Sequence, residues 1–236
     1  MQRIDIHSHI LPNIDDGSHS VEESIALLSM LKHQGIQTVA ATPHFYADHS
    51  RPEAFLKRRN EAWERLENAR VDSMPTILLG TELLYFHGIS MMDCLNDFRI
   101  TGTKLLLLEM PFEPWSKRTI QELLDIQQSN EFWVILAHIE RYFSFQPKQI
   151  WEELHDHGVL FQVNANSFLN WRTRGKIIKL LKQEKIHFIA SDCHNTKLRA
   201  PKLDLAWEKM KRSLNENTMN FLLTTEKKYI PTKDVV

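Results

Sequence analysis

Short apolar segments alternate with longer amphipathic segments along almost all of this 236-residue chain. The short segments have the length of buried strands, and the longer ones repeat apolar residues at helical spacing. Strands that alternate with helices pair in parallel, because each helix returns the chain to the same end of the sheet. We therefore expect residues 1–236 to form a single α/β domain around a parallel sheet. The expected strands are residues 3–7, 37–41, 76–80, 104–110, 132–137, 159–163 and 187–191.

Capping residues and apolar spacing place helices between these strands. Ser20 and Glu23 have the spacing of a capping box at the start of a helix over residues 20–34, and Gly35 follows as its C-cap. Residues 225–236 are polar and rich in lysine, so we expect a loosely held extension there. The other expected helices are residues 52–69, 118–130, 147–157, 172–185, 201–214 and 216–223.

The charge balance and the cysteine count exclude several classes of protein. Lys and Arg number 29 and Asp and Glu number 30, so no overall positive charge favours nucleic acid. No apolar run approaches the roughly 18 residues that span a bilayer, and no signal-peptide pattern opens the chain. Cys94 and Cys193 are too few for a disulfide-rich secreted scaffold. We expect a cytoplasmic protein that neither inserts into a membrane nor binds nucleic acid.

The ionisable residues gather at the carboxyl ends of the expected strands. In parallel barrels these ends form one rim, and active sites are assembled there. Side chains two apart in a strand point the same way, so His7 and His9 can reach one ion, as can Asp192 and His194. Cys193 should point away from them and is interpreted as a packed thiol. The candidate metal ligands are His7, His9, Asp16, His44, Glu82, Glu109, His138, Asp192 and His194.

This set of imidazoles and carboxylates contains no sulfur, which favours Mn, Fe or Zn over a closed structural zinc site. Nine ligands are too many for one ion, so we expect two or three ions that share carboxylates. Glu109 ends a run of four leucines, where a carboxylate is costly unless it is paired or bound to a metal. Asp5 lies on the same strand face as His7 and is expected to hold an imidazole in place. We leave the role of His49 open, and interpret the remaining histidines as surface, turn or cap-flanking residues.

On these residues the sequence resembles the polymerase-and-histidinol-phosphatase (PHP) superfamily. Within it, the chain resembles the bacterial manganese-dependent protein tyrosine phosphatases of capsular and exopolysaccharide synthesis. One position departs from the family pattern, because Ile139 stands where the family has Pro in AHPERY, which leaves the position of Arg141 open. The matching segments, in order, are IDIHSHILPNIDDGSHSVEES, ATPHF, LLGTEL, LLLEMPF, ILAHIERY, FQVNANS and FIASDCHN, with Arg199 beyond them.

The resemblance implies a fold, a set of cofactors and a substrate class. The implied fold is a distorted seven-stranded (β/α)7 barrel of the TIM-barrel type, with three manganese ions at its rim, and Fe or Zn as alternatives. Arg141 and Arg199 match phosphate-binding residues and are the implied catalytic pair. The implied ligand sets are His7, His9, Glu82 and Asp192 for one ion, Glu82, Glu109 and His138 for the second, and Asp16, His44 and His194 for the third.

The implied activity is hydrolysis of phosphotyrosine on a protein, namely the tail of a bacterial tyrosine kinase. A hydroxide bridging the metals would attack phosphorus, so the chain needs no nucleophile of its own. Aromatic residues in segments 43–53 and 111–115 either flank the phosphotyrosine ring or pack within their loops. Phe45 and Tyr46 are the candidates for substrate binding, and Trp115 is weighed in the same way.

Three other functions share some of these features. A phosphatase of histidinol phosphate or another small molecule would use the same metal scheme. A nuclease-like PHP domain fits less well, because the chain has almost no net charge. A non-catalytic module that binds a kinase would not need a complete set of ligands. The sequence leaves open which metal is bound, which residue protonates the leaving group, which kinase is the partner, and whether the chain forms an oligomer.

Overall fold

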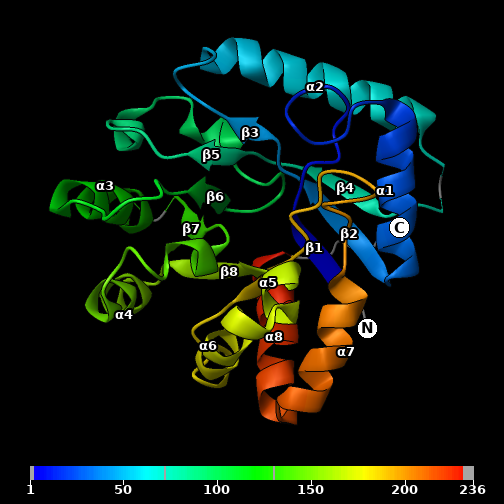
Figure 1. Cartoon of the computed structure of the whole chain (residues 1–236). Coiled ribbons are helices and arrows are strands. Elements are labelled where there is room, and N and C mark those ends of the chain that lie inside the picture. The colour runs from blue at the N-terminus through cyan, green and yellow to red at the C-terminus, as the bar shows by residue number, and fades with distance from the viewer. Residues whose placement is uncertain (1–2, 72, 130, 231–236) are drawn as a thin grey trace.

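The computed structural model describes residues 3–71, 73–129 and 131–230 (Figure 1). The strands in these ranges are β1 (Arg3–Ser8), β2 (Ile36–Ala41), β3 (His44–Phe45), β4 (Thr76–Leu79), β5 (Glu82–Leu84), β6 (Leu105–Glu109), β7 (Trp133–Leu136), β8 (Leu160–Asn164) and β9 (Phe188–Ala190). The α-helices there are α1 (Val21–His33), α2 (Pro52–Ala69), α3 (Lys117–Gln128), α4 (Lys148–Asp156), α5 (Ala165–Leu169), α6 (Trp171–Lys182), α7 (Leu203–Ser213) and α8 (Glu216–Tyr229). Short 3-10 helices are η1 (Ile89–Met91), η2 (Leu95–Phe98) and η3 (Ile139–Tyr142).

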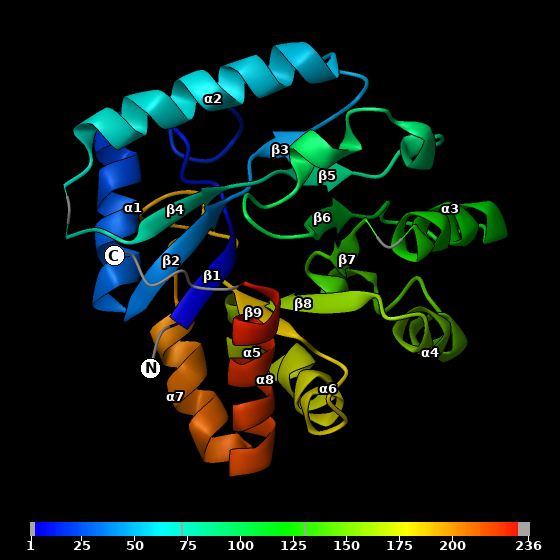
Figure 2. The same ribbon diagram turned by 180° about the vertical axis from the view of Figure 1, so that it is seen from behind.

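The strands form a curled, parallel sheet in two hydrogen-bonded parts. One part has the order β1-β2-β4, and the other has the order β3-β5-β6-β7-β8-β9. The first and last strands lie side by side, because Ser8 bridges Cys193 and the Asp192 N–H donates to the His7 carbonyl over 2.9 Å. Figure 2 shows β1 and β9 together near the centre of the molecule. The expected parallel α/β fold is confirmed.

Two of the seven predicted strands are each followed by a further short strand. Two residues separate β2 from β3, and two separate β4 from β5. Pro43 lies in the first break and has no N–H to donate to a neighbouring strand. In the second break the buried Arg59 of α2 donates to the Gly80 carbonyl over 3.3 Å and to the Thr81 hydroxyl over 3.2 Å.

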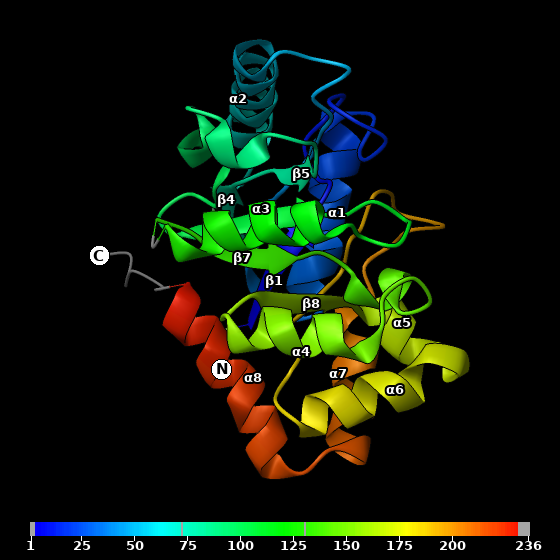
Figure 3. The same cartoon turned by 90° about the vertical axis from the view of Figure 1, so that its left-hand side faces the viewer.

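The apolar core lies on both faces of the sheet. Every residue of β6 is buried, and its alternate side chains enter two different clusters. Leu106 and Leu108 pack in the larger cluster, which contains core residues of helices such as α3, whereas Leu105 and Leu107 pack in a smaller one with Ile4 and other strand residues. A strand buried on both faces reads as a continuous apolar run, which explains LLLL before Glu109. Figure 3 shows α3 and α4 lying across β7 and β8.

The end of the chain differs from the prediction. The helix expected over residues 216–223 continues as α8 to Tyr229, and Thr225 and Glu226 are buried. Residues 225–230 are therefore part of the packed fold, because α8 lies against β1 and β9. Residues 231–236 of the expected extension, and Asn130 at the end of an expected helix, lie outside the described residues. In the described part of the chain, no helix combines the length and apolar character that a membrane crossing requires.

Candidate metal centre and phosphate site

The carboxylate of Glu82 lies at the centre of the polar rim, at the start of β5. Its Oε2 atom is 3.0 Å from Nε2 of His7, 3.2 Å from Nε2 of His9 and 3.0 Å from Nδ1 of His44. Its Oε1 atom is 2.8 Å from Nε2 of His138. One buried carboxylate thus contacts four imidazoles that come from β1 and the residues after it, β3 and the end of β7.

The remaining predicted ligands surround this centre. Oδ1 of Asp16 lies 3.4 Å from Nε2 of both His44 and His194. Oδ1 of Asp192 lies 3.6 Å from Nδ1 of His194. Oε1 of Glu109 lies 3.4 Å from Nε2 of His138. All nine side chains that the sequence singled out therefore meet at one rim.

The donor atoms of this cluster fit divalent ions. Three groups have ligand atoms within 4.8 Å of one another. Buried atoms of His44 (Nδ1), Glu82 (Oε2) and His194 (Nε2) lie close to groups of opposite charge, but none of them makes a hydrogen bond of good geometry. Buried polar atoms without partners are costly in proteins, and each of these is a metal-ligand type. The groups are His9, Asp16, His44 and His194; His7, His9 and Glu82; and His44, Glu82 and Glu109.

The charges of the cluster suit cation binding. Burial alone would raise the pKa of Glu82, but the neighbouring His7 and His138 hold that pKa well below its usual value. The pKa of Asp192 is also held well below its usual value, because burial is outweighed by His7 and His9. Both carboxylates are therefore ionised near neutral pH. His138 and Asp192 adopt left-handed backbone conformations, with φ of 34° and 50°, which are uncommon outside glycine and often mark functional sites.

Asp15 holds the imidazole of His9, a role that the sequence had assigned to Asp5. Oδ2 of Asp15 lies 2.7 Å from Nδ1 of His9 and accepts the His44 N–H over 2.9 Å. The assignment to Asp5 is wrong, because its side chain accepts the backbone N–H groups of Ser191 and His7, and touches no imidazole. The sequence signal for Asp15 is the DDG motif, in which Oδ1 of Asp15 accepts the Gly17 N–H over 2.9 Å.

Gln162 is a further residue that the sequence prediction missed. Its Oε1 atom lies 3.2 Å from Nδ1 of His7 and accepts the His138 N–H over 2.8 Å. A single amide of β8 therefore orients one imidazole and fixes the backbone of another predicted ligand. The signal in the sequence was only a polar residue inside the buried strand FQVN, which has no distinctive spacing.

The two predicted phosphate-binding arginines converge on one carboxylate. Nη2 of Arg141 lies 2.7 Å from Oδ2 of Asp192, and Nη2 of Arg199 lies 3.0 Å from both carboxylate oxygens of Asp192. Both side chains are 37% exposed, so they form the solvent-facing edge of the cluster. Ile139, at the position of the family's proline, is buried at the start of η3, and Arg141 still reaches the rim.

The aromatic residues divide between the core and the rim. Phe45 is buried against Phe55 and Phe98, and Trp115 is buried against other aromatic rings. Tyr46 stacks on His44, with ring centroids 5.2 Å apart. Phe112, which the sequence had not singled out within segment 111–115, is 49% exposed and stacks on His138 at 6.4 Å. Burial gives Phe45 and Trp115 packing roles, whereas Tyr46 and Phe112 lie beside predicted ligands.

Comparisons with known proteins give a consistent result. The family described as capsular polysaccharide synthesis, CpsB/CapC, matches residues 3–230. Tyrosine-protein phosphatase CpsB of Streptococcus agalactiae serotype III is 29% identical over 235 residues, which cover 93% of this chain and 94% of that protein. Tyrosine-protein phosphatase YwqE of Bacillus subtilis is 29% identical over 203 residues, which cover 83% of this chain and 79% of that protein.

Solved structures extend the comparison to the fold. Crystal structures of YwqE from Bacillus subtilis and CpsB from Streptococcus pneumoniae are described as unique metal-dependent tyrosine phosphatases. The match has a TM-score of 0.80 at 26% identity and covers 95% of this chain and 93% of that one. A TatD family hydrolase from Entamoeba histolytica matches with a TM-score of 0.56 at 11% identity, which shows likeness of fold alone.

Proposed function

The chain belongs to the capsular polysaccharide synthesis family CpsB/CapC, and we propose that it is a metal-dependent protein tyrosine phosphatase. The observation that carries this proposal is the position of Glu82, whose carboxylate contacts four imidazoles beside two arginines at an open rim. The relatives named tyrosine-protein phosphatases support the same reaction and favour it over hydrolysis of a small-molecule phosphate.

We assign the nine clustered side chains to three divalent ions, with manganese as the physiological metal. The three overlapping donor groups and the absence of sulfur among them support this assignment. Divalent ions held there would act as Lewis acids that acidify a water molecule and neutralise phosphate oxygens. The assigned ligands are His7, His9, Asp16, His44, Glu82, Glu109, His138, Asp192 and His194.

The residues of the chain itself bind and orient the substrate. Arg141 and Arg199 present guanidinium groups at the rim, and the forked geometry of guanidinium matches phosphate oxygens. Phe112 and Tyr46 offer aromatic faces to the phosphotyrosine ring. Cys193, the thiol between two of the assigned ligands, is buried, and burial raises its pKa to about 12, so it does not serve as a nucleophile. A phenolate leaving group, with a pKa of about 10, needs less help from a general acid than an alkoxide does.

The finer fold and the partner are also proposals. We interpret the curled sheet as a distorted seven-stranded barrel. In this count β2 and β3 form one interrupted strand, β4 and β5 form another, and β9 lies beside β1. We propose one domain over residues 1–236. The substrate would be a phosphotyrosine protein, in particular the tail of a bacterial tyrosine kinase that controls capsule synthesis, in line with the family description.

Metal removal and reconstitution test this function. Purified protein is treated with a chelator and assayed on p-nitrophenyl phosphate and on a phosphotyrosyl peptide, before and after Mn, Fe, Zn or Mg is added. We expect chelation to abolish turnover and Mn to restore it best. Glu82→Gln should remain inactive with Mn, whereas Glu61→Gln, which alters an exposed carboxylate paired with Lys57, should not. Full activity after chelation, or faster hydrolysis of histidinol phosphate than of the peptide, would overturn the proposal.

A further inference from the structure

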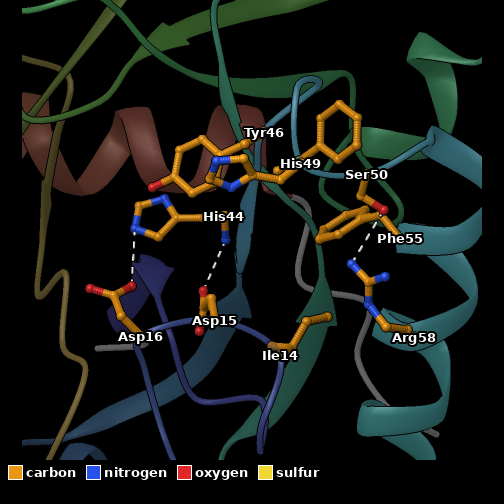
Figure 4. A pocket seen from close by; sticks show the side chains of 10 residues that line it. Ile14, Asp15, Asp16, His44, Tyr46, His49, Ser50, Phe55 and Arg58 are labelled. Carbon is orange, nitrogen blue, oxygen red and sulfur yellow. Dashed lines mark hydrogen bonds and ion pairs between the residues drawn. The ribbon is translucent and has the colours of Figure 1, made fainter.

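A cavity of about 300 Å³ lies beside the candidate metal centre (Figure 4). Its walls come from the loop after β1, from β3 and the residues after it, and from the first turns of α2. This volume is at the lower end of the roughly 300–1,000 Å³ that is usual for ligand sites, so it suits a side chain or two of a peptide. The cavity lies beside the cluster of candidate metal ligands, and Asp16 and His44 belong to both.

The two ends of the cavity carry different kinds of side chain. At one end are Asp16 and His44, which belong to the candidate metal centre. At the other end are Ser50 and Arg58, where the Arg58 guanidinium donates to the Ser50 hydroxyl over 3.3 Å. Figure 4 shows these pairs on opposite sides of the view, with His49 between them. A phosphotyrosyl residue held at the metal centre would place a neighbouring substrate residue in this cavity.

The charge of Arg58 is not neutralised by the protein. Among the described residues, no carboxylate lies within 4.0 Å of its guanidinium, and its only hydrogen bond goes to the Ser50 hydroxyl. Lys57, its neighbour on α2, differs because its amino group lies 3.9 Å from Glu61. An unpaired guanidinium at the end of a cavity is suited to a carboxylate or phosphate, which it binds through charge-assisted hydrogen bonds.

The helix that carries this exposed charge is anchored to the core. Phe55, on the same helix as Arg58, is buried and packs against Phe45, so the first turns of α2 are anchored to the core. Tyr46 stacks on His44, with ring centroids 5.2 Å apart, and forms the wall beside the metal centre.

We propose that Arg58 is a specificity-determining residue that binds an anionic side chain next to the phosphotyrosine of the substrate. This inference rests on the proposed phosphatase function and names the class of substrate that the same site prefers. The shared chemistry is a negative group, which is either the carboxylate of Asp or Glu or the phosphate of a second phosphotyrosine. Arg58 contacts no reacting atom, so its effect should be confined to substrates that carry such a group.

A set of matched peptides tests the proposal. Each peptide has one scissile phosphotyrosine, flanked in turn by Asp, Asn, Tyr or a second phosphotyrosine that is made non-hydrolysable as its phosphonate. For the Mn-loaded protein we expect kcat/KM to be about fivefold higher for the Asp peptide than for the Asn peptide, and the advantage should shrink as salt is raised. If the only preference is for the peptide with the second phosphotyrosine over the Tyr peptide, the subsite binds phosphate. If the Asp peptide is also preferred over the Asn peptide, the subsite binds either anion.

Substitution of Arg58 separates the inference from the function on which it rests. Arg58→Gln should abolish the preference and leave kcat/KM for the Asn peptide and for p-nitrophenyl phosphate unchanged. Lys57→Gln removes the same charge one residue away, outside the cavity, and should keep the preference. Equal losses on acidic and neutral peptides, or a preference that survives in Arg58→Gln, would overturn the inference while leaving the phosphatase function intact.

A binding measurement keeps the test independent of turnover. Fluorescence anisotropy with peptides that carry a non-hydrolysable phosphonate in place of phosphotyrosine reports affinity directly. We expect the Asp peptide to bind the wild-type chain about fivefold more tightly than the Asn peptide, and both to bind Arg58→Gln alike. Equal affinity of the wild-type chain for all the peptides would contradict the role of Arg58, even if every peptide were hydrolysed.

Discussion

Oδ2 of Asp15 lies 2.7 Å from Nδ1 of His9. The same oxygen accepts the backbone N–H of His44, so one carboxylate positions two of the proposed ligands, His9 just after β1 and His44 in β3. Burial alone would lower the pKa of His9, but Asp15, together with Asp192 and Glu82, raises it well above its usual value. Gly17 completes this loop, because a Cβ there would lie 2.3 Å from the carbonyl oxygen of His9.

Replacing Asp15 should weaken metal binding without removing a ligand. We expect Asp15→Asn to lower metal affinity by about 10- to 100-fold, because an amide orients the His9 imidazole less firmly than a carboxylate does. Metal content after dialysis against a competing chelator measures this change. Asp156→Asn alters a well exposed carboxylate and serves as the control. Unchanged metal retention in Asp15→Asn would show that His9 needs no carboxylate partner.

The two rim arginines should affect turnover rather than metal content. We expect Arg141→Ala and Arg199→Ala each to lower kcat/KM by about 100-fold or more, the usual cost of losing a group that stabilises transition-state charge. Arg141→Lys should recover only part of the loss, since an ammonium lacks the guanidinium fork. Arg172→Ala, at an exposed residue beside Trp171, is the control. Wild-type kinetics in both alanine variants would refute a phosphate-binding role.

Phe112 should discriminate aryl from alkyl phosphates. Its exposed ring stacks on His138 and is available to a phosphotyrosine ring. We expect Phe112→Ala to raise KM for a phosphotyrosyl peptide by up to about tenfold, in line with aromatic pairs worth roughly 0.5–1.5 kcal/mol. The slow hydrolysis of a phosphoserine peptide should not change. Phe145→Ala removes another partly exposed ring and is the comparison; equal effects of both variants would argue against a specific contact.

Glu226 should make stability depend on pH. Its carboxyl group is buried in α8, one oxygen has no hydrogen-bond partner, and burial raises its pKa from 4.5 to about 8. The folded protein therefore keeps this group protonated where the unfolded chain ionises it. Its contribution to the free energy of unfolding is complete below about pH 4.5 and is lost as pH rises to about 8.

Urea denaturation at several pH values tests this behaviour. We expect the stability of Glu226→Gln to fall less with pH and to exceed that of the wild type by about 1–3 kcal/mol at pH 8, because the amide does not ionise and so avoids the cost of a buried, unsatisfied charge. Burial also raises the pKa of Asp5, to about 6. Asp5 therefore makes its own contribution to the fall in stability with rising pH, and that contribution remains in the variant. Glu208→Gln, at an exposed position of α7, should follow the wild-type curve. Parallel curves for Glu226→Gln and the wild type would contradict the prediction.

The sequence was sufficient to predict which residues meet at the rim. His7, Glu82, Glu109, His138 and Asp192 lie near the ends of short apolar segments, and parallel pairing brings those ends to one edge. That inference needs only the periods of strands and helices and the direction of pairing. It does not depend on the loops, which is why it succeeded for residues far apart along the chain.

Only the tertiary structure decided what each nearby side chain contacts. Asp5 and Asp15 are both carboxylates close to His7 and His9 in sequence, yet Asp15 reaches His9 because the loop folds back over β1. Phe45 is buried and Phe112 is exposed, although both follow expected strands in the sequence. The local spacing of apolar residues determines where a strand ends. The direction of a loop side chain depends on packing between distant segments, which local sequence patterns do not reveal.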